Sequence, residues 1–243
     1  MPRILTYNVH RCVGVDRRLD VARVAQVIAR LRPDIVALQE LDVGRARTGG
    51  VDQAHEIARR LEMSVHFHAA LKVEEELYGD AILTTFPERL VQAGPLPGYP
   101  RIQSLEPRGA LWVRVEIEGR LVQIINTHLG LVPREQQIQA RWIAGPKWLA
   151  HPERVGPTIL LGDFNATANS LVHRTLTDRL QPARSLSPHK SPTSTFPSTL
   201  PVLRIDHLFV SEEIRVQDVF APFDSLTRIA SDHLPLVMDF ELI

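Results

Sequence analysis

The sequence predicts an α/β protein in which two β-sheets pack face to face and helices cover their outer faces. The chain has 243 residues, enough for one large core, and its composition (44% hydrophobic, 23% charged) is ordinary for a globular domain. Short apolar runs typical of buried strands recur along the whole chain, between fewer amphipathic helical patterns. Two stacked sheets with helices outside bury this many strands, so we expect one domain over residues 1–243.

The first part of the chain alternates strand and helix patterns. Residues 4–9 form an apolar run that predicts a strand, and residues 20–31 place aliphatic side chains at helical spacing. Asp20 is a suitable N-cap for this helix, and Pro33 ends it. A second strand is predicted at residues 35–38 and a second helix at residues 52–61.

Successive strands follow, and then helices and strands mix again. Strands are predicted at residues 64–69, 81–85, 111–117, 121–127, 158–161, 204–210, 216–221 and 236–241, and helices at 133–149 and 170–180. Glu118-Gly119 is typical of a tight hairpin turn between two of these strands. Residues 181–201 are rich in Pro, Ser and Thr and predict a surface loop.

Composition limits the class of protein. Lys and Arg together number 28, as do Asp and Glu, so no overall field favours nucleic acid or an anionic membrane, although a local basic groove can still exist. The single cysteine, Cys12, excludes an internal disulfide and a cysteine-rich zinc site. The first residues lack the apolar core of a signal peptide, and no apolar run is long enough to span a bilayer. We therefore expect a cytoplasmic protein without an integral membrane segment.

Polar side chains stand at the ends of five apolar runs. These side chains are Asn8, Glu40, His128, the pair Asp163 and Asn165, and the pair Asp232 and His233. A carboxylate at the tip of a buried strand is costly unless it is paired or binds a cation. Five such tips in one domain predict a single shared site that depends on a metal.

The segment Gly162-Asp163-Phe164-Asn165 carries the sharpest signal. Residues i and i+2 of an extended chain point the same way, so Asp163 and Asn165 share a face. A carboxylate can take a proton from water, and an amide beside it can donate to a phosphoryl oxygen. For this segment alone, a strand-to-turn junction in which both side chains satisfy backbone groups remains an alternative.

Strand alternation also links Asp206 to His233. Asp206 shares a face with Leu208 and Val210, where a carboxylate needs a partner, and the imidazole of His233 can provide one. An Asp that orients a histidine is a known arrangement in hydrolases. His207 points the other way and is expected to pack.

The remaining chemistry favours phosphate and a hard cation. Asn126 and His128 share one strand face, and a histidine donates readily to phosphate. Glu40 and Asn8 offer oxygen ligands, which suit Mg²⁺ or Mn²⁺. The sequence contains no Gly-x-Ser-x-Gly elbow, so serine-hydrolase chemistry is not supported.

Eight short segments carry the polar residues discussed above or neighbour them, and their order along the chain is informative. They are Thr6-Tyr7-Asn8-Val9, Val36-Ala37-Leu38-Gln39-Glu40, Tyr78-Gly79-Asp80-Ala81-Ile82-Leu83, Arg108-Gly109-Ala110-Leu111, Asn126-Thr127-His128-Leu129, Gly162-Asp163-Phe164-Asn165, Arg204-Ile205-Asp206-His207 and Ser231-Asp232-His233. Together they resemble the motifs of the endonuclease/exonuclease/phosphatase superfamily, and the match runs almost end to end. The resemblance implies the deoxyribonuclease-like fold, a four-layer α/β (α+β) sandwich of two packed mixed β-sheets flanked by helices, with the site at one edge.

The resemblance also implies roles for the residues that match. Glu40 and Asn8 resemble the ligands of a divalent cation, with Asp232 in or near the metal shell. Asp163, beside Asn165, resembles the residue that activates or aligns the attacking water.

On the phosphate side, His128 and His233 resemble the pair that contacts phosphate, with Asp206 orienting His233. Arg108, Asn126 and Tyr78 are expected to bind substrate.

The chain departs from the family pattern at two places. Asp80 stands where family members usually carry Asn, which replaces a donor by a negative charge. The segment Ser194-Thr195-Phe196-Pro197-Ser198 lacks the tryptophans found there in apurinic endonucleases and inositol phosphatases. The chain most resembles the compact bacterial metal-dependent hydrolases of the superfamily.

The leading hypothesis is a Mg²⁺- or Mn²⁺-dependent phosphoesterase that cleaves a phosphodiester by in-line attack of water. Nucleic acid, a phospholipid head group and a small phosphorylated metabolite all fit as substrates, and no partner protein is indicated. The alternatives are a nonspecific endonuclease or exonuclease and a phospholipid head-group phosphodiesterase. A non-catalytic phosphate-binding member is also an alternative, but Glu40 and the Asp163–Asn165 pair are all retained.

Overall fold

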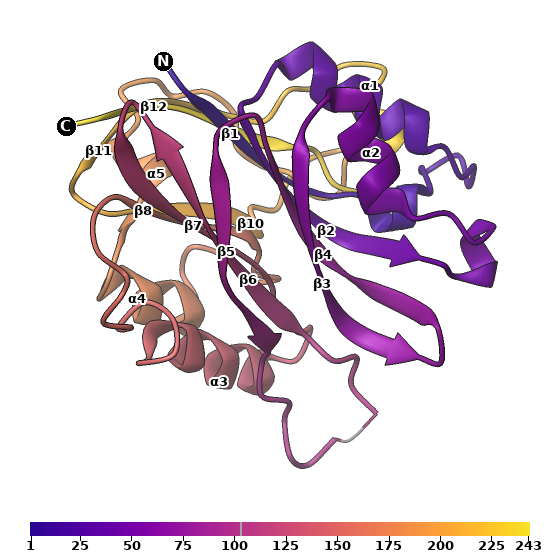
Figure 1. Cartoon of the computed structure of the whole chain (residues 1–243), viewed down its shortest axis with the longest axis horizontal. Coiled ribbons are helices and arrows are strands. Elements are labelled where there is room, and N and C mark those ends of the chain that lie inside the picture. The colour runs from indigo at the N-terminus through magenta and orange to yellow at the C-terminus, as the bar shows by residue number, and fades with distance from the viewer. Residues whose placement is uncertain (103) are drawn as a thin grey trace.

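The computed structural model describes residues 1–102 and 104–243 and shows two six-stranded mixed sheets packed face to face (Figure 1). The first sheet runs in the order β11-β12-β1-β2-β4-β3, with β1 (Arg3–Asn8), β2 (Ile35–Val43), β3 (Ser64–Val73), β4 (Glu76–Thr84), β11 (Ile214–Phe220) and β12 (Leu236–Leu242). The second runs β5-β6-β7-β8-β10-β9, with β5 (Glu88–Pro95), β6 (Gly109–Ile117), β7 (Arg120–His128), β8 (Thr158–Asp163), β9 (Gln181–Pro182) and β10 (Asp206–Val210). The predicted fold class is confirmed.

Helices cover the outer face of each sheet. α1 (Val21–Leu31) and α2 (Gln53–Leu61) pack on the first sheet, and α3 (Pro133–Ala144) and α4 (Leu171–Thr177) pack on the second (Figure 1). Four shorter turns complete the described helices: η1 (His10–Cys12), η2 (Ala46–Thr48), α5 (Ala183–Leu186) and α6 (Thr227–Ala230). Within residues 1–102 and 104–243, none of the helices has the length and apolar character that a bilayer span requires.

Three apolar layers hold the four structural layers together. Between the sheets, side chains such as Ile35, Val113 and Ile159 form the central core. A second layer joins the first sheet to α1 and α2, and a third joins the second sheet to α3 and α4. Burial of this apolar surface is the main term that stabilises the sandwich.

Each sheet contains one parallel pair of strands, and these pairs determine where the site lies. β1 pairs in parallel with β2, and β7 pairs in parallel with β8. Parallel strands end on the same side, so the residues that close these four strands gather at one edge of the sandwich.

The structure differs from the predicted elements mainly at exposed segments. β5 was not predicted because it is an edge strand whose side chains are largely half-buried or exposed, so the sequence has no clear apolar alternation there. α3 ends at Ala144, before the predicted residue 149, because Gly145-Pro146 follows. The predicted loop at 181–201 contains β9 and α5, and α6 was also missed because each is only a few residues long.

Candidate active site

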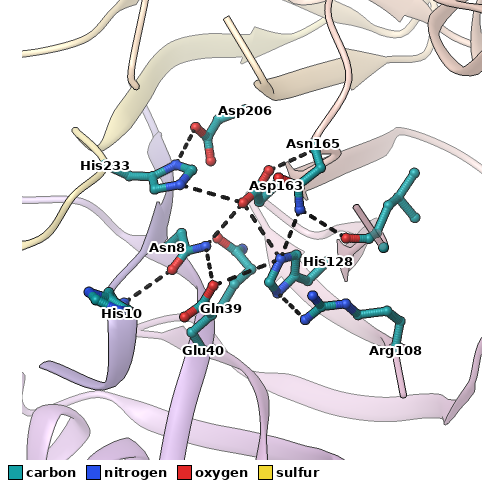
Figure 2. Close-up of polar contacts among 12 residues, drawn as sticks. Asn8, His10, Gln39, Glu40, Arg108, His128, Asp163, Asn165, Asp206 and His233 are labelled. Carbon is teal, nitrogen blue, oxygen red and sulfur yellow. Dashed lines mark hydrogen bonds and ion pairs between the residues drawn. The ribbon is translucent and has the colours of Figure 1, made fainter. Parts of the chain in front are cut away.

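The predicted site residues gather where β1, β2, β7 and β8 end and β10 begins (Figure 2). Asn8 closes β1, Glu40 lies in β2, His128 closes β7 and Asp163 closes β8. Antiparallel pairing of β8 with β10 sets Asp206 directly opposite Asp163. The structure therefore brings these five residues together at one edge of the sandwich.

Asp163 is the centre of the site. It is 1% exposed, its Oδ2 accepts a hydrogen bond from Asn8 Nδ2 (3.0 Å), and its Oδ1 accepts one from the backbone N–H of Asn165 (2.8 Å). The Nε2 atoms of His128 and His233 lie 3.6 and 3.7 Å from Oδ2. Burial raises the pKa of Asp163 to about 7, the charge of Asp206 adds to the rise, and His233 opposes it. A carboxylate of this kind can accept a proton near neutral pH.

Asp206 holds His233, as the strand alternation predicted. Asp206 Oδ2 is 2.9 Å from His233 Nδ1 and also accepts a hydrogen bond from Thr195 Oγ1 (2.5 Å). Burial alone lowers the pKa of His233, but the charge of Asp206 and its hydrogen bond outweigh burial and raise this pKa to about 10. His233 is therefore an imidazolium at neutral pH, with its Nε2–H directed at the side of Asp163.

His128 has a defined tautomer. Arg108 Nη1 lies 3.2 Å from His128 Nδ1, and a guanidinium can only donate, so Nδ1 is the acceptor and the ring proton sits on Nε2. Burial, together with the positive charges of Arg108 and His233, lowers the pKa of His128 well below its usual 6.5, so the ring is neutral. Arg108 in turn donates from Nη1 to Glu106 (2.6 Å).

Two donors face each other beside Asp163. Asn165 Nδ2 donates to the carbonyl of Leu129 (3.0 Å) and lies 3.2 Å from Nε2 of His128 (Figure 2). Because both Nδ2 and Nε2 carry protons, they cannot bond to each other. The pair is suited to share one anionic oxygen between them.

Glu40 reaches the site through an irregularity in β2. The register of β2 with β4 shifts between Leu38 and Leu41, and Glu40 adopts a left-handed backbone with φ 61°. Its Oε1 accepts from Asn8 Nδ2 (3.0 Å) and lies 4.0 Å from His128 Nε2. A bulge that re-aims a side chain is a common device beside active sites.

Asp232 lies at the mouth of the site. Its side chain is 38% exposed, and its Oδ1 is 3.8 Å from Nδ1 of His10. The backbone N–H of His10 donates to Asn8 Oδ1 (3.1 Å), so Asn8 turns its amide nitrogen, not its oxygen, toward Glu40 and Asp163. To bind a metal ion through Oδ1, Asn8 would therefore have to rotate its side-chain amide.

The donor set fits a hard divalent cation. The carboxylates of Glu40 and Asp163 converge on the same amide donor, and burial raises the pKa of Asp163 although His233 opposes the rise. One ligand atom from each of Asp163, Asp206 and His233 also lies within 4.8 Å of the others. His233 Nδ1 is already bonded to Asp206, and Mg²⁺ or Mn²⁺ prefers oxygen, so the carboxylates are the better ligands in this group. The predicted ligands Glu40, Asn8 and Asp232 stay a prediction.

Asp80, the departure from the family pattern, is a buried carboxyl with a raised pKa. It is 3% exposed, and burial raises its pKa to about 8, against the opposing charge of Arg108. At pH 7 the carboxyl is mostly protonated and can donate a hydrogen bond, as the amide of the family asparagine does.

All three predicted substrate-binding residues, Arg108, Asn126 and Tyr78, are buried. Asn126 is fully buried, donates to the carbonyls of Leu38 and Ala81 (2.9 Å each) and accepts from Gln39 Nε2 (2.7 Å). Its amide therefore braces the two sheets beneath the site, which favours a structural role over contact with substrate. Tyr78 is 5% exposed and lies under the guanidinium of Arg47.

Sequence reasoning missed His10 and Thr195. His10 contacts both Asn8 and Asp232, and its place two residues after Asn8 was a usable signal. Thr195 reaches Asp206 from an irregular loop, and no local pattern marks such a contact.

Comparison with known proteins agrees with this geometry. A model of the Endonuclease/Exonuclease/phosphatase family matches residues 5–233. The uncharacterized protein YbhP of Escherichia coli (strain K12) is 23% identical over 251 residues, which cover 99% of this chain and 96% of that protein.

Solved structures show the same fold. An endonuclease/exonuclease/phosphatase from Beutenbergia cavernae DSM 12333 has a TM-score of 0.80 at 24% identity, over 99% of this chain and 71% of that chain. A functionally unknown conserved protein from Enterococcus faecalis V583 has a TM-score of 0.79 at 23% identity, over 99% and 100%. Since the family match spans nearly the whole chain and includes the site residues from Asn8 to His233, the chain belongs to the endonuclease/exonuclease/phosphatase family.

Proposed function

We propose that this protein is a divalent-metal-dependent phosphodiesterase that cleaves its substrate by in-line attack of a water molecule. Its family generally hydrolyses phosphate esters. The observation that carries the proposal is the position of Asp163, a buried carboxylate of raised pKa between two imidazoles of opposite character.

Asp163 is the proposed base. Its carboxylate accepts the proton of the attacking water at Oδ2, while the backbone N–H of Asn165 holds Oδ1 in place. Asn8 orients the same carboxylate through Nδ2.

The phosphoryl oxygens are bound by fixed donors. The neutral His128 donates from Nε2 and Asn165 donates from Nδ2, so that one oxygen sits between them. His233, held protonated by Asp206, donates from Nε2 on the other side of Asp163. A divalent cation held by Glu40 and neighbouring oxygens would, when bound, offset the negative charge on the phosphoryl oxygens.

The charge balance of the site favours a diester over a monoester. The carboxylates of Glu40, Asp163 and Asp206 lie around one imidazolium, His233, while Arg108 is paired with Glu106. With a divalent cation bound, the charges of the three carboxylates, His233 and the cation sum to zero, so a diester adds one negative charge to the site, whereas a monoester adds nearly two at neutral pH and is repelled more strongly.

Hydrolysis of two soluble substrates tests the proposal. The wild-type protein is expected to cleave bis(p-nitrophenyl) phosphate faster than p-nitrophenyl phosphate with Mg²⁺ or Mn²⁺, and to lose activity when EDTA is added. Glu40→Ala is expected to remove most of the turnover.

Glu118→Ala is the matched control, because Glu118 is also a glutamate with a left-handed backbone (φ 52°) and lies in the β6–β7 turn, at the opposite end of β7 from His128. Turnover that survives EDTA, or an unaffected Glu40→Ala variant, would contradict the metal-dependent reaction. Faster cleavage of the monoester would contradict the diester assignment.

A further inference from the structure

Large apolar side chains are exposed together on one side of the site. Three loops, the last with the short helix α6 that follows it, contribute them, and we call the group the apolar rim: Val15 (41% exposed), Leu200 (68%), Val202 (64%), Phe223 (53%) and Ile229 (41%, in α6). Single exposed apolar residues are normal on any protein, whereas a group of them marks an interaction surface.

Contacts between the three loops make the apolar rim continuous. The backbone N–H of Val15 donates to the carbonyl of Ile229 (3.1 Å), and these two residues line one surface hollow with Thr199 and Arg228. Arg228 lies over the ring of Phe223 (5.1 Å) and donates to the carbonyl of Thr199 (3.5 Å), next to Leu200. The loops thus present one surface although they are far apart in sequence.

The apolar rim adjoins the active site directly. The backbone N–H of Ser198 donates to the carbonyl of Asp232 (2.7 Å), and the ring of Phe196 packs 4.9 Å from the ring of His233. The loop that carries Leu200 and Val202 therefore also forms the wall beside His233.

Arginines and aspartates are both exposed on this surface, and the aspartates are engaged in contacts within the protein. Arg17, Arg18 and Arg228 are exposed among the apolar side chains. The nearby carboxylates are engaged within the protein: Asp16 pairs with Arg23 (2.7 Å), and Asp224 accepts the backbone N–H groups at the start of α6. Apolar side chains interspersed with arginines match a bilayer of anionic phospholipid. The apolar side chains enter the hydrocarbon region, and the anionic head groups attract the arginines.

We propose that the apolar rim docks the protein on a membrane surface that contains anionic phospholipid, and so presents a phospholipid phosphodiester to the site. The membrane part of this proposal stands on the surface alone. The choice of a phospholipid as substrate rests on the proposed phosphodiesterase function.

Vesicle binding tests the docking. The wild-type protein is expected to co-sediment with vesicles of phosphatidylcholine and phosphatidylglycerol, and much less with vesicles of phosphatidylcholine alone. The double variant Leu200→Ser/Ile229→Ser is expected to bind at least about tenfold more weakly, because it removes two apolar groups from the contact. Arg17→Gln/Arg18→Gln is expected to reduce the preference for phosphatidylglycerol. Vesicle binding by this variant is also expected to depend less on salt concentration.

The matched control is Leu121→Ser/Val155→Ser. Both residues are exposed (50% and 69%) but lie near the starts of β7 and β8, at the opposite end of these strands from the site. This variant is expected to bind vesicles like the wild-type protein. Equal binding by the two double variants, or no binding by the wild-type protein, would overturn the proposal. So would dimerisation in sedimentation velocity that the rim variant abolishes, since the surface would then join two copies of the chain.

Activity separates this inference from the proposed function. All the variants are expected to keep wild-type turnover of bis(p-nitrophenyl) phosphate, because none of the changed residues belongs to the site, while the rim variant loses turnover of vesicle phospholipid. Cleavage of the soluble diester without vesicle binding would overturn the docking alone. Vesicle binding without cleavage of any diester would overturn the phosphodiesterase and leave the docking supported.

Discussion

The side chains of Asp206, His233 and Asp163 lie in a row, so that the imidazolium of His233 stands between two carboxylates. The row is buried where the end of β8 pairs with the start of β10. The Asp206 carboxylate fixes which nitrogen of His233 is turned to the site, and the imidazolium lies close enough to Asp163 to oppose the rise of its pKa. The role of each group therefore depends on the other two.

Asp206→Asn is expected to lower turnover by about 10⁴, the loss seen when the orienting aspartate of a hydrolytic triad is changed in this way. The amide can present a donor to His233 Nδ1, which favours the wrong tautomer and removes the charge that keeps the ring protonated. Steady-state kinetics with bis(p-nitrophenyl) phosphate measure the loss, and Mg²⁺ titration is expected to give nearly unchanged affinity. Asp218→Asn is the control, since Asp218, like Asp206, accepts hydrogen bonds from side-chain hydroxyls (Ser187 and Ser191) but lies in β11. Turnover comparable to the wild-type protein would mean that Asp206 is only structural.

Glu40 gives a second prediction, in which two inactive variants differ in stability. A left-handed backbone disfavours any residue with a Cβ by roughly 1 kcal/mol, so Glu40→Gly is expected to unfold with a free energy about 1 kcal/mol higher than Glu40→Ala. Both variants are expected to lose activity. Chemical denaturation measures the difference.

The same pair of substitutions at Glu118, which has a similar φ, is expected to give the same stability difference with activity intact. Equal stability of Glu40→Gly and Glu40→Ala would show that the bulge in β2 relaxes when the carboxylate is removed.

At this scale, sequence reasoning succeeded where a residue lies in a regular strand. Alternation placed Asp206 on the correct face and identified His233 as its partner, because side chains of a strand alternate strictly. It could not find Thr195 or the amide orientation of Asn8, because these depend on how a loop and a 3₁₀ turn fold around the site.

Among the elements, the pairing of β7 with β8 most directly sets the geometry of catalysis. His128 and Asp163 are register partners at the end of this parallel ladder, so the distance between the two side chains is fixed by backbone hydrogen bonds. Gly162, one residue before, has φ 146°, and a Cβ there would lie 1.8 Å from the carbonyl oxygen of Thr127.

Gly162→Ala is therefore expected to lower the free energy of unfolding by at least about 2 kcal/mol and to reduce turnover, because β8 must move away from β7. Thermal denaturation and kinetics check the two effects. Gly94→Ala in β5, where a Cβ meets nothing within 4 Å, is the control and is expected to change little. A Gly162→Ala variant as stable as Gly94→Ala would mean that the close approach of the strands is not required.

The contact between β10 and the segment that follows β8 makes stability depend on pH. His207 in β10 donates from Nε2 to the carbonyl of Ala166 (2.8 Å) and packs against Phe164, and burial lowers its pKa to about 4. A histidine whose pKa is lowered by folding contributes stability that is complete above the unfolded pKa of about 6.5 and is lost as pH falls toward 4.

His207→Gln keeps an N–H donor but does not titrate. Its free energy of unfolding is expected to fall by about 1–3 kcal/mol less than that of the wild-type protein between pH 6.5 and pH 4. Urea denaturation at a series of pH values measures it. His55→Gln, at an exposed position on α2, is the control. An unchanged pH dependence in His207→Gln would assign the acid sensitivity to other groups, of which the nearby His173 is the first to test.

Elements with a buried face were predictable from the sequence, and elements without one were not. α1 begins after its predicted N-cap Asp20, whose side chain accepts from the N–H of Arg23. β5 and α6 have too little buried apolar surface to leave a periodic signal.

Over the whole molecule, the site is assembled from both sheets. β1 and β2 supply Asn8 and Glu40 from one sheet, and β7 and β8 supply His128 and Asp163 from the other. Beneath them, Gln39 and Asn126 bond across the interface and hold the two sheets in one relative position. The number of apolar runs predicted two packed sheets, but the strand order could not be read from them, because pairing between distant segments has no local signature.

The strand order of the first sheet has a consequence for the timing of synthesis. β1 is hydrogen-bonded on one side to β2 and on the other to β12, and His233 lies in the segment that leads into β12. A nascent chain on the ribosome can therefore complete the second sheet up to β10 while the first sheet still has an open edge at β1. Hydrolysis must wait until residues 231–242 have left the exit tunnel, so newly made chains acquire activity only after this region has been translated and has emerged.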